Sequence, residues 1–424
     1  MKFSRAKGCY DIYEGADEPW KEPSLWVAAE NAARRVARAY GLSEIRTPVF
    51  EYTDVFLRSV GETSDIVSKE MYTFEDKGGR SLTLRPEITA PVIRAYIENS
   101  LFQKGSNRLY YFGPCWRYDR AQKGRYRQFS QFGIEILGVD DISADIETIA
   151  GLLEFYRVLG LKNTTLLINS IGNMEVRAKF VQVLKDHFAP VKDKLSEDSQ
   201  RRLGENPLRI LDSKDEKDIE LCKQAPTIFD FLTPEQSDRF SQLQSSLKEL
   251  GIDYTVSPNL VRGLDYYCDT VFEVVAQDDA RAQSTIGAGG RYDGLVKGMG
   301  GPDVPGVGFA TGIERILQNL LAQNPGTSFE EPPEYYFIPL SAECRQALLP
   351  YLIKFRQAGL RCLLHQGGLN VKKAFTQAEK LNAQTAVLLG DDELKNKKIK
   401  IKNLSTREEV EYPISQLDKI ASQS

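Results

Sequence analysis

The chain of 424 residues is too long for a single hydrophobic core, so we expect two or three domains. Its net charge of −4, with 42% hydrophobic and 27% charged residues, is ordinary for a globular protein and excludes a uniformly basic coat, although local basic patches can still contact nucleic acid. The six cysteines form no CxxC pair and there are two histidines, so we expect no zinc site, no disulfide framework and a cytoplasmic location. No apolar run approaches the length of a membrane span, so no membrane contact is expected.

The N-terminal part of the chain alternates helix and strand patterns. WVAAENAARRVARAYG (26–41) predicts an amphipathic helix, and IRTPVFEYTDVFLRSVG predicts a strand and then a helix. The strand-like segments SLTLRPE, RLYYFGPCWRY, RQFSQFGIEILG and, much later, YYCDTVFEVV are separated by turns. This pattern indicates a largely antiparallel sheet.

Residues 171–255 have helical periodicity instead. Because strand patterns resume afterwards, this segment is interpreted as a helical insertion within a first domain spanning 1–325. A stretch rich in Pro, Gly and Glu follows, and we take 326–333 as a linker. The pattern over 334–424 is β-α-β-α-β, which is typical of a small α/β domain with a mainly parallel sheet.

The segment RYDRAQKGRYRQFSQFGIEIL (117–137) combines an arginine cluster with a strand. Successive strand residues point to opposite faces, so the odd-numbered residues share one face and the apolar even-numbered ones face a core. The odd-numbered residues are Arg125, Arg127, Phe129, Gln131, Gly133 and Glu135. Guanidinium groups bind phosphate, an aromatic ring stacks on a base, and Gly133 would leave room for a ligand. The plainer alternative is a solvated basic hairpin with an edge-strand glutamate.

Other candidate residues lie in three short motifs. Glycine-based phosphate loops are absent, since GAGGRYDG and GVGFATG fall short of GxGxxG. Arg315 follows GVGFATG at a helix start that favours anions, although a packing turn explains these glycines equally well. RGLDYY places Arg262 at the mouth of a strand, with Tyr266 and Tyr267 nearby or simply half-buried. Thr89, two residues after Glu87, is equally well explained as a helix cap.

The C-terminal domain carries two lysine-rich segments. LNVKKAFTQAEKLNA places Lys372, Lys373 and Lys380 on a helix, and KNKKIKIK (395–402) alternates lysine with apolar residues. The second segment predicts an exposed hairpin edge protected by lysines, with an RNA-facing patch as the alternative.

Together these motifs resemble those of bacterial histidyl-tRNA synthetases, a family of class II aminoacyl-tRNA synthetases. IRTPVFE is similar to motif 1 of that class, 117–135 to motif 2 and GVGFATGIERI to motif 3. RGLDYY followed by TVFE, and GAGGRYDGL, are similar to the histidine-specific signatures. The resemblance covers essentially the whole chain. It implies an α+β catalytic domain with an antiparallel sheet and a helical insertion, followed by an α/β anticodon-binding domain.

The resemblance also implies an activity and a set of site residues. Histidine would be activated with ATP to histidyl-adenylate and pyrophosphate, and then transferred to the 3′ end of tRNA(His). Arg117 would bind the α-phosphate, Arg125 and Arg315 the distal phosphates, and Phe129 the adenine ring. Asp119 stands where the family usually has glutamate, so its contact with adenine would have to reach further. Arg262 would bridge the histidine carboxylate and the α-phosphate. The implied histidine-binding residues are Glu87, Thr89, Gln131, Glu135, Arg262, Tyr266 and Tyr267, and the implied tRNA acceptor contacts are Arg120 and Gln122.

The implied partners are histidine, ATP with Mg²⁺ as the substrate complex, tRNA(His) and a second copy of the chain joined through motif 1. Zinc, an organic cofactor and a metal site of the protein itself are not implied. Three positions depart from the family pattern, since Ile88 replaces a glycine, Lys7 an arginine and Ala121 a proline. Two alternatives are a catalytically inactive paralogue, acting as a histidine-sensing regulatory subunit of ATP phosphoribosyltransferase, and a general RNA-binding protein. Such paralogues typically lack the anticodon domain and erode motif 3 and RGLDYY.

Overall fold

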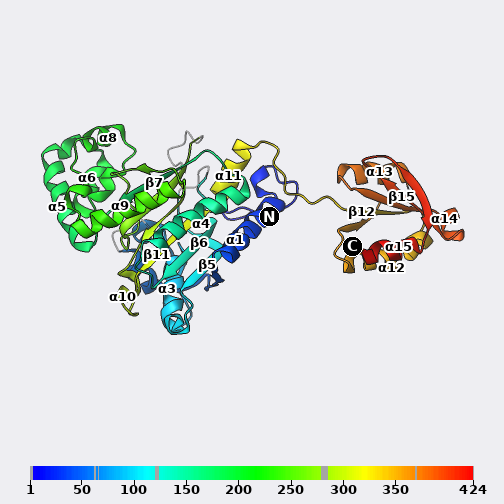
Figure 1. The fold of residues 1–424 in the computed structure, drawn as a ribbon, viewed down its shortest axis with the longest axis horizontal. Helices are drawn as coiled ribbons and strands as arrows, with labels where there is room; N and C mark the ends of the chain where they lie inside the picture. The colour runs from blue at the N-terminus through cyan, green and yellow to red at the C-terminus, as the bar shows by residue number, and fades with distance from the viewer. Residues whose placement is uncertain are drawn as a thin grey trace. The chain divides into compact units, whose positions relative to one another are not determined.

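The computed structural model describes residues 3–61, 64, 66–119, 124–277, 285–367 and 370–423. Two compact units divide the chain, Met1–Ser328 and Phe329–Ser424, and each is built on its own sheet (Figure 1). No helix among the described residues is long and apolar enough to cross a membrane.

The first unit is organised by an eight-stranded mixed sheet. Its strands follow the order β1 (Ser43–Glu44), β5 (Arg108–Trp116), β6 (Gln128–Leu137), β11 (Gly306–Gly312), β10 (Thr285–Arg291), β9 (Cys268–Ala276), β7 (Thr164–Ser170) and β8 (Thr255–Val256). The pairs β1–β5 and β7–β8 are parallel and the other pairs are antiparallel. The largely antiparallel sheet expected from the sequence is therefore confirmed, and β6 lies inside it rather than at an edge.

The helices of the first unit are α1 (Pro23–Ala39), α2 (Thr53–Val60), α3 (Thr89–Glu98), α4 (Ser143–Leu159), α5 (Met174–Phe188), α6 (Glu197–Glu205), α7 (Leu208–Leu211), α8 (Glu216–Cys222), α9 (Pro234–Glu249), α10 (Leu295–Gly298) and α11 (Ile313–Gln323). Figure 1 shows α5, α6, α8 and α9 gathered at one end of the unit, where the chain leaves the sheet after β7.

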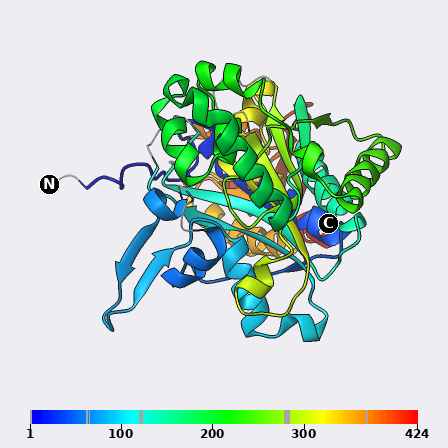
Figure 2. The same ribbon diagram turned by 90° about the vertical axis from the view of Figure 1, so that its left-hand side faces the viewer.

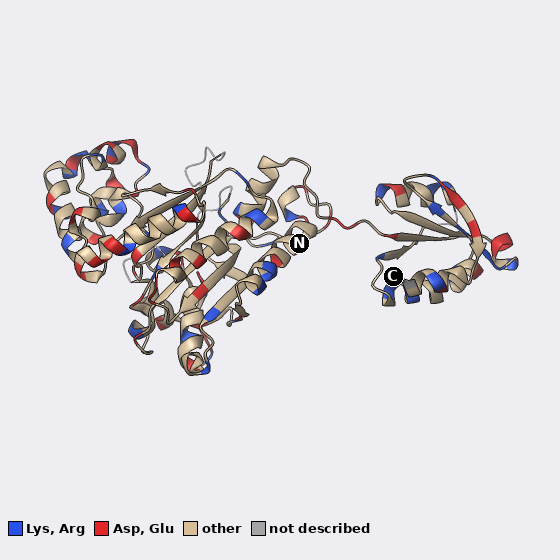
Figure 3. Cartoon of the chain, viewed as in Figure 1, with Lys and Arg blue, Asp and Glu red and all other residues tan. Residues whose placement is uncertain are grey.

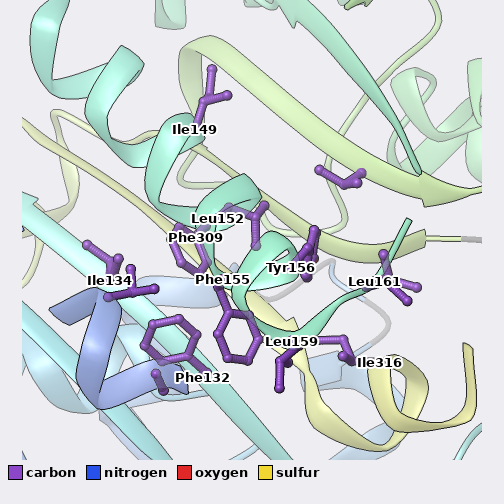
Figure 4. Packing of buried hydrophobic residues seen from close by; sticks show 14 of the residues in the cluster. Phe132, Ile134, Ile149, Leu152, Phe155, Tyr156, Leu159, Leu161, Phe309 and Ile316 are labelled. Carbon is purple, nitrogen blue, oxygen red and sulfur yellow. The ribbon is translucent and has the colours of Figure 1, made fainter. Parts of the chain in front are cut away.

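The main hydrophobic core lies between one face of the sheet and the helices α1, α4 and α11. Phe155 of α4 packs against Phe132 of β6, which in turn meets Phe309 of β11, with ring centroids 4.6 and 5.5 Å apart (Figure 4). The even-numbered apolar residues of β6, Phe132, Ile134 and Ile136, are buried in this core. The face assignment made from strand periodicity is thus confirmed for β6.

A second core lies on the opposite face of the sheet. It joins Val92 and Ile93 of α3 to apolar residues of α5–α8, with Tyr111 of β5 among them. Helix α9 differs from these insertion helices because its buried Leu243 and Leu247 belong to the first core, where α9 packs against α4. The helical segment is consequently shared between two cores.

A small three-stranded antiparallel sheet extends from the first unit (Figure 2). Its order is β2 (Phe50–Tyr52), β4 (Ser81–Leu84) and β3 (Tyr72–Glu75). Three aromatic side chains of this sheet are about half exposed, namely Phe50, Tyr52 and Phe74.

The second unit contains a five-stranded sheet with the order β13 (Cys362–Leu364), β12 (Tyr335–Pro339), β14 (Thr385–Leu389), β15 (Lys398–Asn403) and β16 (Glu409–Pro413). Strands β13, β12 and β14 are parallel to one another, and the pairs β14–β15 and β15–β16 are antiparallel. Its helices are α12 (Ala342–Gln357), α13 (Val371–Lys380), α14 (Asp391–Lys395) and α15 (Gln416–Gln423). Phe337 packs with α12 and α15, whereas Tyr336 and Ile338 pack with α13, so the helices cover both faces.

The lysine-rich strand β15 is not an edge strand, because it pairs with both β14 and β16. The expectation of a lysine-protected edge over 395–402 is therefore wrong. Lys400 pairs with Glu393 at 2.6 Å, and Lys398 pairs with Glu411 of the edge strand β16 at 2.5 Å. Strand periodicity identified the strand but carried no information on which strands flank it.

Candidate active site

A cavity of about 200 Å³ lies on the odd-numbered face of β6. It is bounded by β6, β10, β11 and the start of α11, and it brings together residues that are far apart in the sequence. The residues expected to bind ATP all line it, together with two of those expected to bind histidine: Arg117, Asp119, Arg125, Phe129, Arg315, Gln131 and Arg262. The remaining histidine-binding candidates lie further along the same face, as their contacts below indicate.

Three arginines concentrate positive charge in this cavity. The Arg117 guanidinium donates to the carbonyl oxygen of Pro86 at 2.8 Å and lies over the Phe129 ring at 5.1 Å. Arg125 pairs with Asp119 at 2.9 Å. Burial lowers the pKa of Arg315, and the neighbouring Arg125 and Arg117 lower it further. Such a cluster of like charges favours the binding of an anion.

Arg315 is held in place by two backbone groups. It donates to the carbonyl oxygen of Gly124 at 3.1 Å and to that of Thr285 at 2.8 Å. The guanidinium thereby links the segment just before β6 to the first residue of β10.

Arg262 approaches the cavity from another direction. It forms an ion pair with Glu273 of β9, and its guanidinium lies 5.4 Å from the centre of the Tyr267 ring. The second carboxylate oxygen of Glu273 accepts a hydrogen bond from the Thr285 hydroxyl at 2.9 Å. The Nε atom of Arg262 is buried and has no hydrogen-bond partner among the described residues. A buried donor of this kind can bind an oxygen of a ligand.

Glu87, and not Thr89, caps helix α3. The Glu87 carboxylate accepts hydrogen bonds from the backbone N–H groups of Thr89 and Ala90 at 2.7 and 2.8 Å. The alternative interpretation of Thr89 as the cap is therefore wrong. Burial raises the pKa of Glu87, although these backbone hydrogen bonds oppose the rise.

The Thr89 hydroxyl donates instead to Glu135 at 2.7 Å, and the Tyr292 hydroxyl donates to the other oxygen of the same carboxylate. Glu135 is 1% exposed, and burial raises its pKa to about 8. The alternative of a solvated edge-strand glutamate is contradicted by this burial. A carboxyl group fixed by two hydroxyls inside the protein is a candidate acceptor for a polar ligand.

The missing side chain of Gly133 leaves room for Tyr111 rather than for a ligand. A Cβ atom built on Gly133 would lie 2.3 Å from the hydroxyl oxygen of Tyr111, which is its cross-strand neighbour on β5. The expectation that this glycine leaves room for a ligand is therefore wrong. Three further tyrosines gather nearby, with the ring of Tyr266 4.6 Å from Tyr267 and 5.7 Å from Tyr292.

Ile88, which departs from the family pattern, is 2% exposed and packs in the second core. It is not among the residues that line the arginine-rich cavity. Arg120 and Gln122, the expected contacts to the tRNA acceptor end, lie outside the described residues, as does Ala121.

Comparison with known proteins places this geometry in a family. A family model described as Histidyl-tRNA synthetase matches residues 23–316, and another described as Anticodon binding domain matches residues 334–423. The chain belongs to the histidyl-tRNA synthetase family. A histidine–tRNA ligase from Protochlamydia amoebophila (strain UWE25) is 47% identical over 421 residues, covering 98% of this chain and 99% of that protein. One from Geobacillus sp. (strain WCH70) is 44% identical over 98% of this chain and 97% of that protein.

A solved structure shows the same architecture. The crystal structure of apo S. aureus histidyl-tRNA synthetase matches with a TM-score of 0.81 and 35% identity, covering 99% of this chain and 100% of that chain. The class II fold implied by the motifs is confirmed by this match together with the family models.

Several residues of this candidate site were not predicted from the sequence. Tyr292 and Glu273 lie within motifs that were noted, GGRYDGL and TVFE, but strand periodicity does not say which side chains meet across strands. Glu314, which is 2% exposed and lines the cavity, directly precedes the noted Arg315. No sequence pattern indicated a role for Tyr10, because its hydrogen-bond partner Glu314 is 304 residues away along the chain.

Proposed function

We propose that the protein is a histidine–tRNA ligase, which activates histidine with MgATP to histidyl-adenylate and pyrophosphate and then transfers histidine to the 3′ end of tRNA(His). Membership of the histidyl-tRNA synthetase family supports this activity. The structural observation that carries the proposal is the buried Glu135 carboxylate, which lies on the same strand face as Phe129 and Gln131 of the arginine-lined cavity.

The spacing along β6 suits an adenylate. Strand residues advance about 3.3 Å each, so Phe129 and Glu135 are separated by roughly 20 Å along one face. Phe129 would stack on adenine at one end and Glu135 would accept a proton of the imidazole at the other, together with Tyr267. Gln131, Glu87 and Thr89 would hold the amino and carboxylate groups of histidine, and Tyr266 would close the pocket.

The arginines would supply the charge that the reaction requires. Arg117 would bind the α-phosphate, and Arg125 and Arg315 the distal phosphates. Arg262, whose Nε lacks a partner among the described residues, would bridge the carboxylate and the α-phosphate. Its charge would then stabilise the negative charge that develops in the transition state. Mg²⁺ enters with ATP as part of the substrate, and neither zinc nor an organic cofactor is proposed.

The second unit would bind the anticodon part of tRNA. Helix α13 presents Lys372, Lys373 and Lys380 around a shallow depression, and Figure 3 marks basic residues on α13 and on β15. The β15 lysines pair with acidic residues, so α13 is the better candidate for phosphate contacts. Arg120 and Gln122 remain the proposed acceptor-end contacts. We assign 1–325 as the catalytic domain with its insertion at 171–255, 326–333 as the linker and 334–424 as the anticodon-binding domain.

We further propose a homodimer joined through motif 1, in the cytoplasm and away from membranes. Val49 and Phe50 lie within the motif 1 segment and Tyr52 directly follows it, and all three are 41–52% exposed, which is unusual for neighbouring large apolar side chains. A cavity of about 340 Å³ lies beside this region, between α1, β1 and β5. A second copy of the chain would cover both features.

Charging of tRNA tests the proposal against its alternatives. The purified protein, supplied with histidine, MgATP and tRNA(His), should form histidyl-tRNA, and it should not charge tRNA(His) with other amino acids. A histidine-sensing regulatory subunit of ATP phosphoribosyltransferase would bind histidine without charging. A general RNA-binding protein would bind tRNA regardless of histidine. The regulatory alternative is less supported, because the chain matches histidine–tRNA ligases over almost their whole length and retains the anticodon-binding unit.

A further inference from the structure

The N-terminal segment before α1 lies against the ATP-binding side of the cavity. The carbonyl oxygen of Gly8 accepts a hydrogen bond of 2.8 Å from the backbone N–H of Arg127, just before β6. Gly8 has a φ of +83°, and a Cβ there would lie 2.7 Å from the Arg127 side chain, so a glycine is required at this contact. The Tyr10 ring packs edge-on against Trp20 and Tyr126, with centroids 4.8 and 5.2 Å away.

One carboxylate joins this segment to the site. The Tyr10 hydroxyl donates to Glu314, and the same carboxylate oxygen accepts the backbone N–H of Ser130 at 2.7 Å. Glu314 is the second residue of α11, is 2% exposed and lines the cavity. It precedes Arg315, and Ser130 follows Phe129. A single buried group therefore fixes the strand and the helix that carry two of the proposed ATP-binding residues.

We infer that Tyr10 is a positioning residue for ATP: through Glu314 it holds the start of β6 and the first turn of α11, and thereby Phe129 and Arg315, in the geometry that binds the nucleotide. This inference rests on the proposed ATP site. Tyr10 would act without touching ATP, and it would affect ATP more than histidine, because Glu135 is held by Thr89 and Tyr292 from other elements.

The ionisation of Glu314 should make the effect of Tyr10 depend on pH. Burial raises the pKa of Glu314 to about 7, and the hydrogen bonds from Tyr10 and Ser130 and the nearby Arg315 oppose that rise. The charge of Glu314 also acts on the buried thiol of Cys115, whose pKa is raised by burial and by this charge. Without the Tyr10 hydroxyl, the pKa of Glu314 would rise further. More of it would then be protonated at neutral pH, and a protonated carboxyl accepts the Ser130 N–H more weakly. Raising the pH would restore the carboxylate.

The test is Tyr10→Phe in the full-length protein, with ATP–pyrophosphate exchange followed at about pH 7 and about pH 8.5. We expect the KM for ATP to rise about three- to tenfold at the lower pH, the effect of losing one hydrogen bond to a carboxylate, and to recover at the higher pH. The KM for histidine should stay within about twofold of wild type. Tyr13→Phe is the matched control, because Tyr13 lies in the same segment and is 49% exposed.

A double variant shows whether Tyr10 acts through Glu314. Glu314→Gln cannot ionise, so Tyr10→Phe added to Glu314→Gln should change the KM for ATP much less than it does alone, and without pH dependence. An unchanged KM for ATP in Tyr10→Phe, an increase equal at both pH values, or equal increases for ATP and histidine would each overturn the inference. If the wild-type protein performs no exchange, the proposed function fails instead, so the two failures are distinguishable.

Discussion

The hydroxyl of Thr89 donates a hydrogen bond of 2.7 Å to the carboxylate of Glu135, which lies 46 residues further along the chain. The helix start that carries Thr89 is itself fixed by Glu87, and Tyr292 holds the other oxygen of Glu135 from the turn after β10. Two separate elements, the start of α3 and the turn after β10, thus orient one buried carboxylate. Because its direction is set before a ligand arrives, an imidazole N–H can bind there without reorganising the pocket.

Glu135→Ala should weaken the binding of histidine far more than the binding of ATP. The substitution would leave the imidazole without its proposed acceptor, at a cost of about 1–3 kcal/mol and more where charge is involved. Exchange kinetics over a histidine titration should show a raised KM for histidine and a lowered kcat. Glu98→Ala, at an exposed position on α3, is the control. A folded Glu135→Ala protein with unaltered histidine dependence would remove Glu135 from the pocket.

The same carboxyl group should make the protein less stable as the pH rises. Its folded pKa of about 8 lies above the ordinary value of 4.5, so between these values the folded state holds a proton that the unfolded state has released. The free energy of unfolding contributed by Glu135 must therefore fall as the pH increases through this window. Urea unfolding across the window should show a smaller decline for Glu135→Gln than for wild type. Equal declines in the free energy of unfolding of the two proteins would contradict the raised pKa of Glu135.

Arg262→Ala and Arg117→Ala should impair chemistry more than binding. A charge that acts mainly in the transition state changes kcat more than KM, and its loss should lower the rate of adenylate formation by about 10²–10³-fold. Arg262→Lys keeps the charge but not the planar fork, so it should recover only part of the rate. Near-wild-type exchange by either alanine variant, with the fold intact by circular dichroism, would show that the role given to that arginine is wrong.

Removal of residues 329–424 should separate the two half-reactions. Each unit has its own hydrophobic core, so the shortened chain should still fold and form adenylate. It should charge tRNA(His) poorly, because the RNA contacts proposed for α13 are lost. Alanine substitution of Lys372 and Lys373 in the full-length chain gives the matched comparison. Full charging by the shortened chain would contradict an anticodon role for the second unit.

Local sequence patterns predicted the parts of the site that depend on local structure. The alternation along β6 assigned Gln131 and Glu135 to one face and Phe132 to the core, because a strand has a period of two. The arginines that line the cavity could be singled out from the sequence because guanidinium groups bind anions. Nothing local said whether Glu87 or Thr89 caps α3, since both side chains can accept a backbone N–H.

Such local patterns could not predict contacts between segments that are distant in the sequence. The space beside Gly133 looked empty from the strand alone, yet the facing strand fills it with Tyr111. The register that brings these two residues together depends on the pairing of β5 with β6. The bond between Tyr10 and Glu314 likewise depends on how the N-terminal segment folds back on α11, which no periodicity encodes.

ATP–pyrophosphate exchange, tested with each of the twenty amino acids, examines the central claim most directly. The reverse of adenylate formation returns labelled pyrophosphate to ATP only when the correct amino acid occupies the pocket. The proposed function predicts exchange with histidine that requires Mg²⁺, and no comparable exchange with the other amino acids. Exchange supported equally well by another amino acid, or absent with histidine, would contradict it.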